Sequence, residues 1–101
     1  MRIIGGKFKG KPIMFLKSPD TRPLKDSVKE NIFNIILHSK LINVELKNSK
    51  ILDLYSGVGS FGLEAISRGA EKVTFVEKNK EAINSLKNNI NSLSIKKNIN
   101  I

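Results

Sequence analysis

The 101-residue chain contains no cysteine and a single histidine, and these absences remove whole classes of protein. Without cysteine, neither a disulfide framework nor a thiolate metal site can form. His38 has no second histidine at a metal-ligand spacing, so we expect it to be exposed near a helix end. The sequence therefore predicts no metal site and no disulfide-stabilised secreted domain.

Long apolar runs are also missing. No stretch approaches the ~20 apolar residues that cross a bilayer. The N-terminus, "MRIIGGKFKGK", lacks the apolar segment of a signal peptide. The length suits one small domain, and we expect a cytoplasmic protein with no membrane partner.

Acidic residues are scarce, and the net charge is +9, from 18 Lys and Arg against 9 Asp and Glu. Residues 1–25 hold seven of the basic side chains and only Asp20 as an acid. Such a segment suits a polyanion, because each neutralised phosphate releases a condensed counterion. A generally lysine-rich, solvated surface is the alternative. We favour a nucleic acid as partner, contacted by Arg2, Lys7, Lys9, Lys11, Arg22 and Lys25.

The first segment, "RIIGGKFKGKPIMF", predicts a β-hairpin with its turn around Gly10. In an extended strand, Lys7 and Lys9 would share one face and Phe8 would point to the other. The stretch "SPDTRP" then predicts a loop, because proline biases the residue before it away from helix.

A helix is predicted in "DSVKENIFNIIL", capped by Asp26 or Ser27, with Ser27 and Glu30 at the capping-box spacing. The spacing of apolar residues predicts one buried stripe, with Lys29, Glu30 and Asn34 on the solvent side. The predicted stripe consists of Val28, Ile32, Ile35 and Ile36.

The second half of the chain alternates between strand and helix patterns. Strands are predicted in "KILDLY" and "KVTFVE", and "IKKNINI" begins a third. Helices are predicted in "SFGLEAISRG", ended by Gly69, and in the segment that starts at Asn79. Strand–helix–strand order favours parallel strands joined by right-handed crossovers. The predicted fold class is therefore α/β with an open parallel sheet.

Three glycines follow the first of these strands. Gly57, Gly59 and Gly62 match G-x-G-x-x-G between a strand and a helix, and Glu77 lies 20 residues after Gly57. The same spacing is found in dinucleotide-binding folds, where the acid binds ribose hydroxyls. The motif alone therefore leaves two ligands open, a dinucleotide and S-adenosylmethionine.

Asp53 favours the second ligand. A diphosphate would sit at the N-terminus of the helix after the glycines. A carboxylate there would repel it, by about 3 kcal/mol for two unit charges ~5 Å apart at an effective dielectric of ~20. S-adenosylmethionine carries no phosphate but has a sulfonium and an ammonium, which Asp53 would attract. An NAD-dependent fragment is thus the less favoured alternative.

Four segments, in this order and spacing, resemble the N-terminal half of the RsmD family: "MRIIGGKFKGKPI", "TRPLKDSVKENIFNII", "ILDLYSGVGSFGLEAISRGA" and "VTFVEKN". The resemblance implies a Rossmann-like, S-adenosylmethionine-dependent methyltransferase fold. It also implies methylation of guanine N2 in small-subunit (16S) ribosomal RNA, with that RNA or its assembly intermediate as partner. The implied cofactor-binding residues are Asp53, Ser56, Gly57, Gly59 and Glu77.

The catalytic motif of the RsmD family, Asp/Asn-Pro-Pro-Phe/Tyr, has no counterpart in the sequence. The last proline is Pro23, and no two prolines are adjacent. We therefore assign no catalytic residue. We expect a truncated or split methyltransferase that binds its cofactor weakly, does not turn over alone and has a separate C-terminal half as a further partner. The strand in "ILDLY" would keep an open apolar edge. A non-catalytic RNA-binding module is the alternative function.

The predicted organisation has three parts. Residues 1–25 form a basic hairpin and loop that face RNA. Residues 26–50 form a helix and a connector. Residues 51–101 form the N-terminal half of the domain that binds S-adenosylmethionine.

Overall fold

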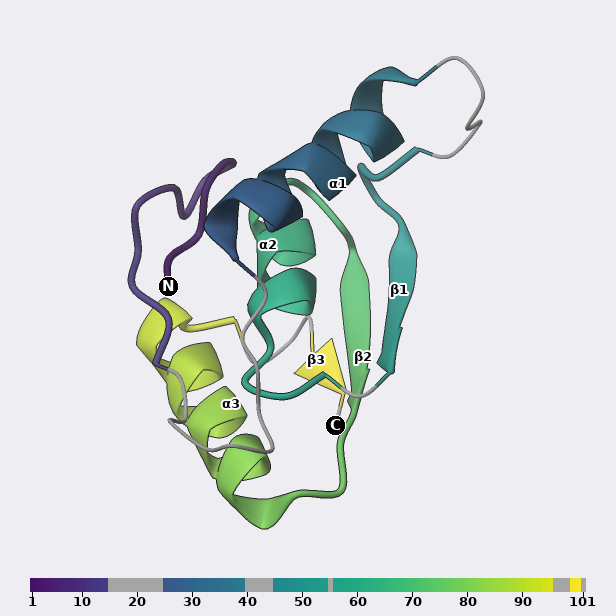
Figure 1. The fold of residues 1–101 in the computed structure, drawn as a ribbon. Helices are drawn as coiled ribbons and strands as arrows, with labels where there is room; N and C mark the ends of the chain where they lie inside the picture. Colours follow the sequence, from purple (N-terminus) through teal and green to yellow (C-terminus); the bar gives the residue numbers. More distant parts are fainter. Residues whose placement is uncertain (15–24, 40–44, 55, 96–98, 101) are drawn as a thin grey trace.

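The structure is a computed structural model that describes residues 1–14, 25–39, 45–54, 56–95 and 99–100 (Figure 1). The predicted loop at "SPDTRP" lies outside the described residues. No helix in the described part of the chain is both long and apolar enough to cross a membrane.

Three parallel strands form one sheet in the order β1-β2-β3. Strand β1 spans Lys50–Leu54, β2 spans Lys72–Val76, and β3 spans Ile99–Asn100. These bounds confirm the predicted open parallel sheet, including its third strand. Within the described residues β1 is an edge strand, as expected for this half of the fold.

Two helices follow the strands in the predicted alternation. Helix α2 (Ser60–Ser67) follows β1, and α3 (Lys80–Leu93) follows β2. The Asn79 side chain accepts a hydrogen bond from the backbone N–H of Ala82 at 3.0 Å, so the predicted start of α3 is confirmed. In Figure 1 α2 and α3 lie to the left of the long strands, with β1 at the right.

The core lies between the sheet and these two helices. Val73 and Phe75 point to this side of β2 and are almost completely buried. Leu63 of α2 and Leu86 of α3 are also fully buried and belong to the same apolar cluster. The strand alternation therefore directs one face of β2 into the core, as a period of two requires.

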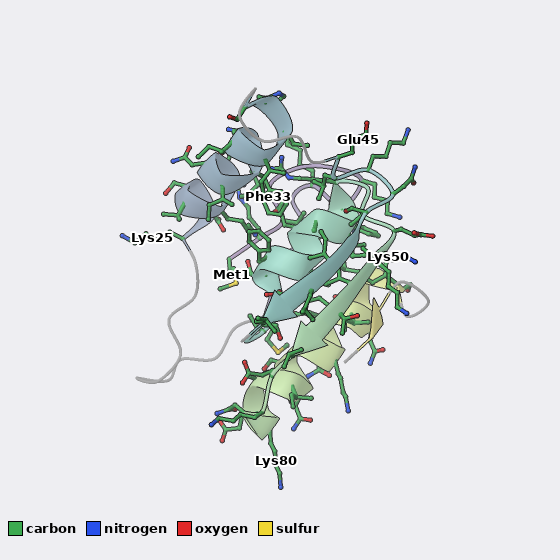
Figure 2. The ribbon with its side chains drawn as sticks, turned by 90° about the vertical axis from the view of Figure 1, so that its right-hand side faces the viewer. Met1, Lys25, Phe33, Glu45, Lys50 and Lys80 are labelled. Atoms are coloured by element: carbon green, nitrogen blue, oxygen red, sulfur yellow. The ribbon has the colours of Figure 1, made fainter. Side chains whose placement is uncertain are left out.

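Helix α1 (Asp26–His38) buries a different face from the one predicted. Lys29 and Phe33 are completely buried, whereas Val28 and Ile35 are 41% and 55% exposed. The prediction was wrong for these residues because Lys29 pairs with the buried Glu64 of α2, whereas Glu30 and Asn34 are exposed as predicted. The Phe33 ring stacks on Phe61 of α2 with centroids 4.7 Å apart, and Figure 2 shows it on the inner side of α1.

The predicted cap of α1 is also absent. Lys25 is the N-cap residue, and it makes no side-chain cap hydrogen bond. Asp26 lies in the first helical turn, with its carboxylate 3.8 Å from the Arg2 guanidinium. Asp26 thus places a negative charge at the positive end of the helix and forms an ion pair with the side chain of Arg2.

The predicted hairpin is reduced to one antiparallel bridge, between Arg2 and Pro12. Residues 5–10 form turns, so Lys7, Phe8 and Lys9 do not alternate on a strand. The Lys7 ammonium instead lies 5.1 Å from the centroid of the Phe8 ring. The backbone N–H groups of Gly5, Lys7 and Phe8 bond to α2 and not to a second strand, which explains why the ladder stops.

Candidate functional site

The loop after β1 lies at the carboxyl ends of β1 and β2. We call residues 56–59 the glycine loop. Ser56 N–H donates to the carbonyl of Val76 at 3.0 Å, which ties the loop to the end of β2. Gly57 and Gly59 have φ values of 57° and 90°, a left-handed backbone that glycine adopts without steric cost. The sequence predicted this loop and its two neighbouring elements.

The three glycines of the motif have different neighbours. A Cβ on Gly59 would lie 2.3 Å from the Leu86 side chain, and one on Gly62 would lie 2.3 Å from Phe75. A Cβ on Gly57 would meet no described atom within 4 Å. Gly59 and Gly62 are therefore required by helix packing, whereas Gly57 faces open space where a ligand can approach the backbone.

Asp53 lies at the carboxyl end of β1 and faces the first turn of α2. Its Oδ2 accepts a hydrogen bond from Gly62 N–H at 3.1 Å. Burial raises the pKa of the Asp53 carboxyl above its ordinary value, and the Gly62 hydrogen bond offsets this only in part. It makes no ion pair with any described residue. A half-buried carboxylate without a cation is thus available at this position.

Glu77 follows β2 and reaches the glycine loop. Its Oε1 accepts from Gly57 N–H at 2.9 Å, and its Oε2 accepts from the N–H groups of Lys78 and Asn79. The hydrogen bond from Asn79 is the main cause that holds the pKa of Glu77 below its ordinary value. Glu77 is therefore ionised at neutral pH, with acceptor capacity left on Oε1 for a ligand.

The Ser56 hydroxyl is the one buried side-chain oxygen or nitrogen without a hydrogen-bond partner among the described residues. Buried hydroxyls are normally paired, because desolvation without a partner costs free energy. An unpaired hydroxyl in a loop between two carboxylates suits a ligand that supplies the missing hydrogen bond.

These groups form one site with a clear electrostatic character. The structure brings together the five predicted cofactor-binding residues, Asp53, Ser56, Gly57, Gly59 and Glu77, although Gly59 is occupied by core packing. Two carboxylates lie beside an open stretch of backbone. The arrangement suits a ligand that has hydroxyl donors at one end and positive charge at the other. In the described part of the chain, no three acids or histidines are placed to hold a metal ion.

The predicted RNA contacts lie mostly on the N-terminal segment, which we define as residues 1–14. Five of the six are described and exposed: Arg2, Lys7, Lys9, Lys11 and Lys25. Arg22 lies outside the described residues.

The tip of this segment lies at one end of α2. Lys7 N–H donates to the carbonyl of Ser67 at 2.9 Å, beside the C-terminal end of α2. Ser60 begins α2 seven residues earlier, about 10 Å away at 1.5 Å per residue. The basic tip and the glycine loop are therefore at opposite ends of α2.

A buried charge network was missed by the sequence reasoning. Lys29 of α1 and Glu64 of α2 are both completely buried, with Nζ and Oε1 3.2 Å apart. The Arg68 guanidinium lies 2.8 Å from the other oxygen of Glu64. A signal was present, since Glu64 is the lone acid in the apolar helix "SFGLEAIS". A single acid on an apolar helix requires a buried partner.

Glu64 also binds the N-terminal segment. Its carboxylate accepts from the N–H groups of Ile4 and Gly5 at 2.8 and 2.9 Å. Burial alone would raise the pKa of Glu64. The hydrogen bonds from Ile4, Arg68 and Gly5 and the charge of Lys29 outweigh burial, so the pKa is lowered. Glu64 is therefore a stable anion that holds the segment against α2.

Asn89 of α3 was missed as well. The side chain is 4% exposed and hydrogen-bonds both the N–H and the carbonyl of Met14. It also donates to the carbonyl of Val58 at 3.0 Å. The spacing offered a signal, because Asn89 falls three residues after Leu86 and four before Leu93 on the apolar face of α3.

Comparison with known proteins places the chain among methyltransferases. The family model described as "Conserved hypothetical protein 95" matches residues 1–101. Ribosomal RNA small subunit methyltransferase D of Haemophilus influenzae is 41% identical over 93 residues, covering 92% of this chain and 45% of the relative. The protein of the same name from Escherichia coli is 33% identical over 93 residues, covering 92% of this chain and 44% of the relative.

A solved structure gives the same result for the fold. The Escherichia coli protein yhhF superimposes with a TM-score of 0.80 at 30% identity, over 98% of this chain and 49% of that protein. The chain thus spans about half the length of the relatives that it matches. With the glycine loop, the parallel sheet and these matches in agreement, the chain belongs to the RsmD family of ribosomal RNA methyltransferases, described as Conserved hypothetical protein 95.

Proposed function

We propose that these residues form the part of a small-subunit (16S) rRNA guanine-N2 methyltransferase that binds S-adenosylmethionine and docks RNA. The observation that carries the proposal is the half-buried carboxylate of Asp53, which has no cation among the described residues and bonds to Gly62 N–H. The Asp53 carboxylate already accepts the Gly62 N–H at the N-terminus of α2, so this N–H is not available to bind a diphosphate. The negative charge of the carboxylate would also repel a diphosphate there.

The chemistry of the residues in the site suits S-adenosylmethionine. Glu77 supplies an ionised acceptor for the ribose hydroxyls, and the open side of Gly57 admits the ligand to the backbone. The unpaired Ser56 hydroxyl supplies a further hydrogen bond. Asp53 faces the positive end of the ligand. When bound, S-adenosylmethionine supplies an activated methyl group from its sulfonium.

RNA docking is proposed for the N-terminal segment. Of its exposed lysines, Lys7 lies beside the C-terminal end of α2, and α2 separates this end from the glycine loop by about 10 Å. That distance favours contact with the phosphate backbone away from the base that is modified. The segment therefore contributes affinity and orientation, whereas the chemistry takes place at the opposite end of α2.

Calorimetric titration tests the cofactor proposal. We expect the wild type to bind S-adenosylmethionine, and NAD to bind at least tenfold more weakly. Asp53→Asn should weaken S-adenosylmethionine at least tenfold, because it removes the charge that faces the ligand cation. Glu45→Gln, a change of the same charge on an exposed side chain, is the control. Tight NAD binding by the wild type would contradict the proposal.

Methyl transfer is expected to need residues beyond those present here. No Pro-Pro pair occurs among the 101 residues, so the catalytic motif that the family resemblance implies is absent. Incubation of the chain with labelled S-adenosylmethionine and unmodified 16S rRNA should therefore give binding without methylation. Labelled guanine in the product would show that these residues carry out the reaction unaided.

A non-catalytic RNA-binding role is the second candidate, favoured by the exposure of Lys7, Lys9 and Lys11. Replacing these three lysines with alanine should lower RNA affinity and reduce the salt dependence of binding, by roughly 0.7–0.9 in the logarithmic slope per lost phosphate contact. The matched control replaces three exposed lysines elsewhere: Lys47, Lys72 and Lys80. An equal effect of both triple variants would dismiss the segment as a specific RNA site.

A further inference from the structure

The N-terminal segment is fixed at three places to elements distant in sequence. Glu64 accepts from Ile4 and Gly5, 60 and 59 residues away. The Ser67 hydroxyl donates to the carbonyl of Gly5 and accepts from Phe8 N–H. At the far end, Asn89 pairs with both backbone groups of Met14 across 75 residues. The basic segment is therefore held at both of its ends.

Two of the side chains that hold the segment also hold the glycine loop or the residue next to it. Lys29 Nζ donates to the carbonyl of Arg2 at 2.7 Å and to the hydroxyl of Ser60 at 3.1 Å. Ser60 directly follows the loop and begins α2. Asn89 donates to the carbonyl of Val58 within the loop. Each side chain thus joins the segment directly to the loop region.

Neither side chain has a hydrogen-bond donor left for a ligand. The Lys29 ammonium has three N–H donors, and its partners are the carbonyl of Arg2, the hydroxyl of Ser60 and the carboxylate of Glu64. Both donors of the Asn89 amide are used, and its oxygen accepts from Met14. Both side chains are almost completely buried. Their role is therefore to position other residues and not to contact substrate.

We infer that Lys29 and Asn89 couple the glycine loop to the basic N-terminal segment, so that S-adenosylmethionine and RNA each strengthen the binding of the other. The inference rests on the proposed function. A ligand that fixes the backbone of Val58 and Ser60 also fixes the acceptors that hold these two side chains. The segment is then ordered before RNA arrives, and the cost of ordering is shared between the two ligands. Coupling between binding sites is reciprocal, and typical values correspond to roughly 5–150-fold in affinity.

The test measures RNA affinity with and without saturating S-adenosylmethionine, with 16S rRNA as the probe. The wild type should bind RNA at least about fivefold more tightly when the cofactor is present. Asn89→Ala should lower this ratio, because only the Lys29 connection then remains, while each ligand still binds separately. Asn88→Ala, an exposed asparagine next to it on α3, should keep the wild-type ratio. The ratio of the two RNA affinities is informative, because a general loss of folded protein would weaken RNA binding equally with and without the cofactor.

Lys29→Met removes the other connection and should also lower the ratio, whereas the exposed Lys87→Met, its control, should keep the wild-type ratio. Hydrogen exchange on the wild type needs no variant: S-adenosylmethionine should slow exchange at the N–H groups of Ile4 and Met14. A wild type that binds both ligands independently, with no change at these two amides, would overturn the coupling and leave the proposed function standing. Failure of the wild type to bind S-adenosylmethionine would overturn both.

Discussion

The two faces of the sheet differ in what covers them, although both carry large apolar side chains. On one face, Val73 and Phe75 are buried beneath α2 and α3. On the other, which we call the open face, Leu52, Leu54 and Val76 are 61%, 57% and 46% exposed. Parallel sheets are normally buried on both sides, and their strands are accordingly apolar throughout. The open face thus has the composition of a covered surface, and we expect it to be buried in the larger domain in which this sheet functions.

The largest expected effect is on the covered face. Phe75→Ala removes a fully buried ring and should lower the free energy of unfolding by about 3–5 kcal/mol. Leu52→Ala, on the neighbouring strand but on the open face, should change it by less than about 0.5 kcal/mol. Urea denaturation followed by circular dichroism measures both. Equal losses would show that the two faces are packed alike in solution.

Two acids near α2, Glu64 and Asp53, should differ in how their charge affects the stability of the fold. Glu64→Gln leaves Lys29 with a weaker partner and should cost about 3 kcal/mol, because an unbalanced buried charge is expensive. The lowered pKa of Glu64 also gives a pH dependence: its stabilising contribution is complete above the ordinary value of 4.5 and is lost as the pH falls below that value. Thermal unfolding between pH 3 and 6 should show this loss in the wild type and not in the variant.

Asp53 should behave in the opposite way. Because burial raises the pKa of Asp53, its ionised form destabilises the fold at neutral pH, and this penalty is relieved as the pH falls through the raised pKa. Asp53→Asn should therefore leave the stability at pH 7 unchanged or raise it by up to about 1 kcal/mol, while cofactor binding weakens. A clear loss of stability in the same unfolding assay would mean that the carboxylate has a structural role.

The smallest effect on stability is expected on the open face itself. Replacing Leu52, Leu54 and Val76 with threonine should change the free energy of unfolding by less than about 0.5 kcal/mol per position. Threonine is branched at Cβ, which suits a strand. The same variant should bind less of a hydrophobic dye and associate less with itself, as measured by fluorescence and light scattering. Undiminished dye binding would place the accessible apolar surface elsewhere.

Local patterns were sufficient to predict the second half of the chain. The strands β1 and β2, the Asn79 cap and the glycine loop all follow from short-range rules of alternation, capping and turn geometry. The site was predictable as far as Asp53 and Glu77, because the ends of parallel strands meet at one edge of a sheet.

The first half was predicted less well because its structure depends on distant partners. Lys29 was assigned to solvent by its charge, but Glu64 lies 35 positions later and makes its burial possible. The hairpin ladder was replaced by bonds from residues 4–8 to α2. No local window of sequence contains both members of these pairs.

The attachment of Met14 to Asn89 has a consequence for the order of events during synthesis. At 5–20 residues per second, translation needs roughly 4–15 s to proceed from one to the other over this separation of 75 positions. The two partners of this attachment are therefore made at well separated times. The Met14 end of the segment takes its final place only once α3 has been synthesised.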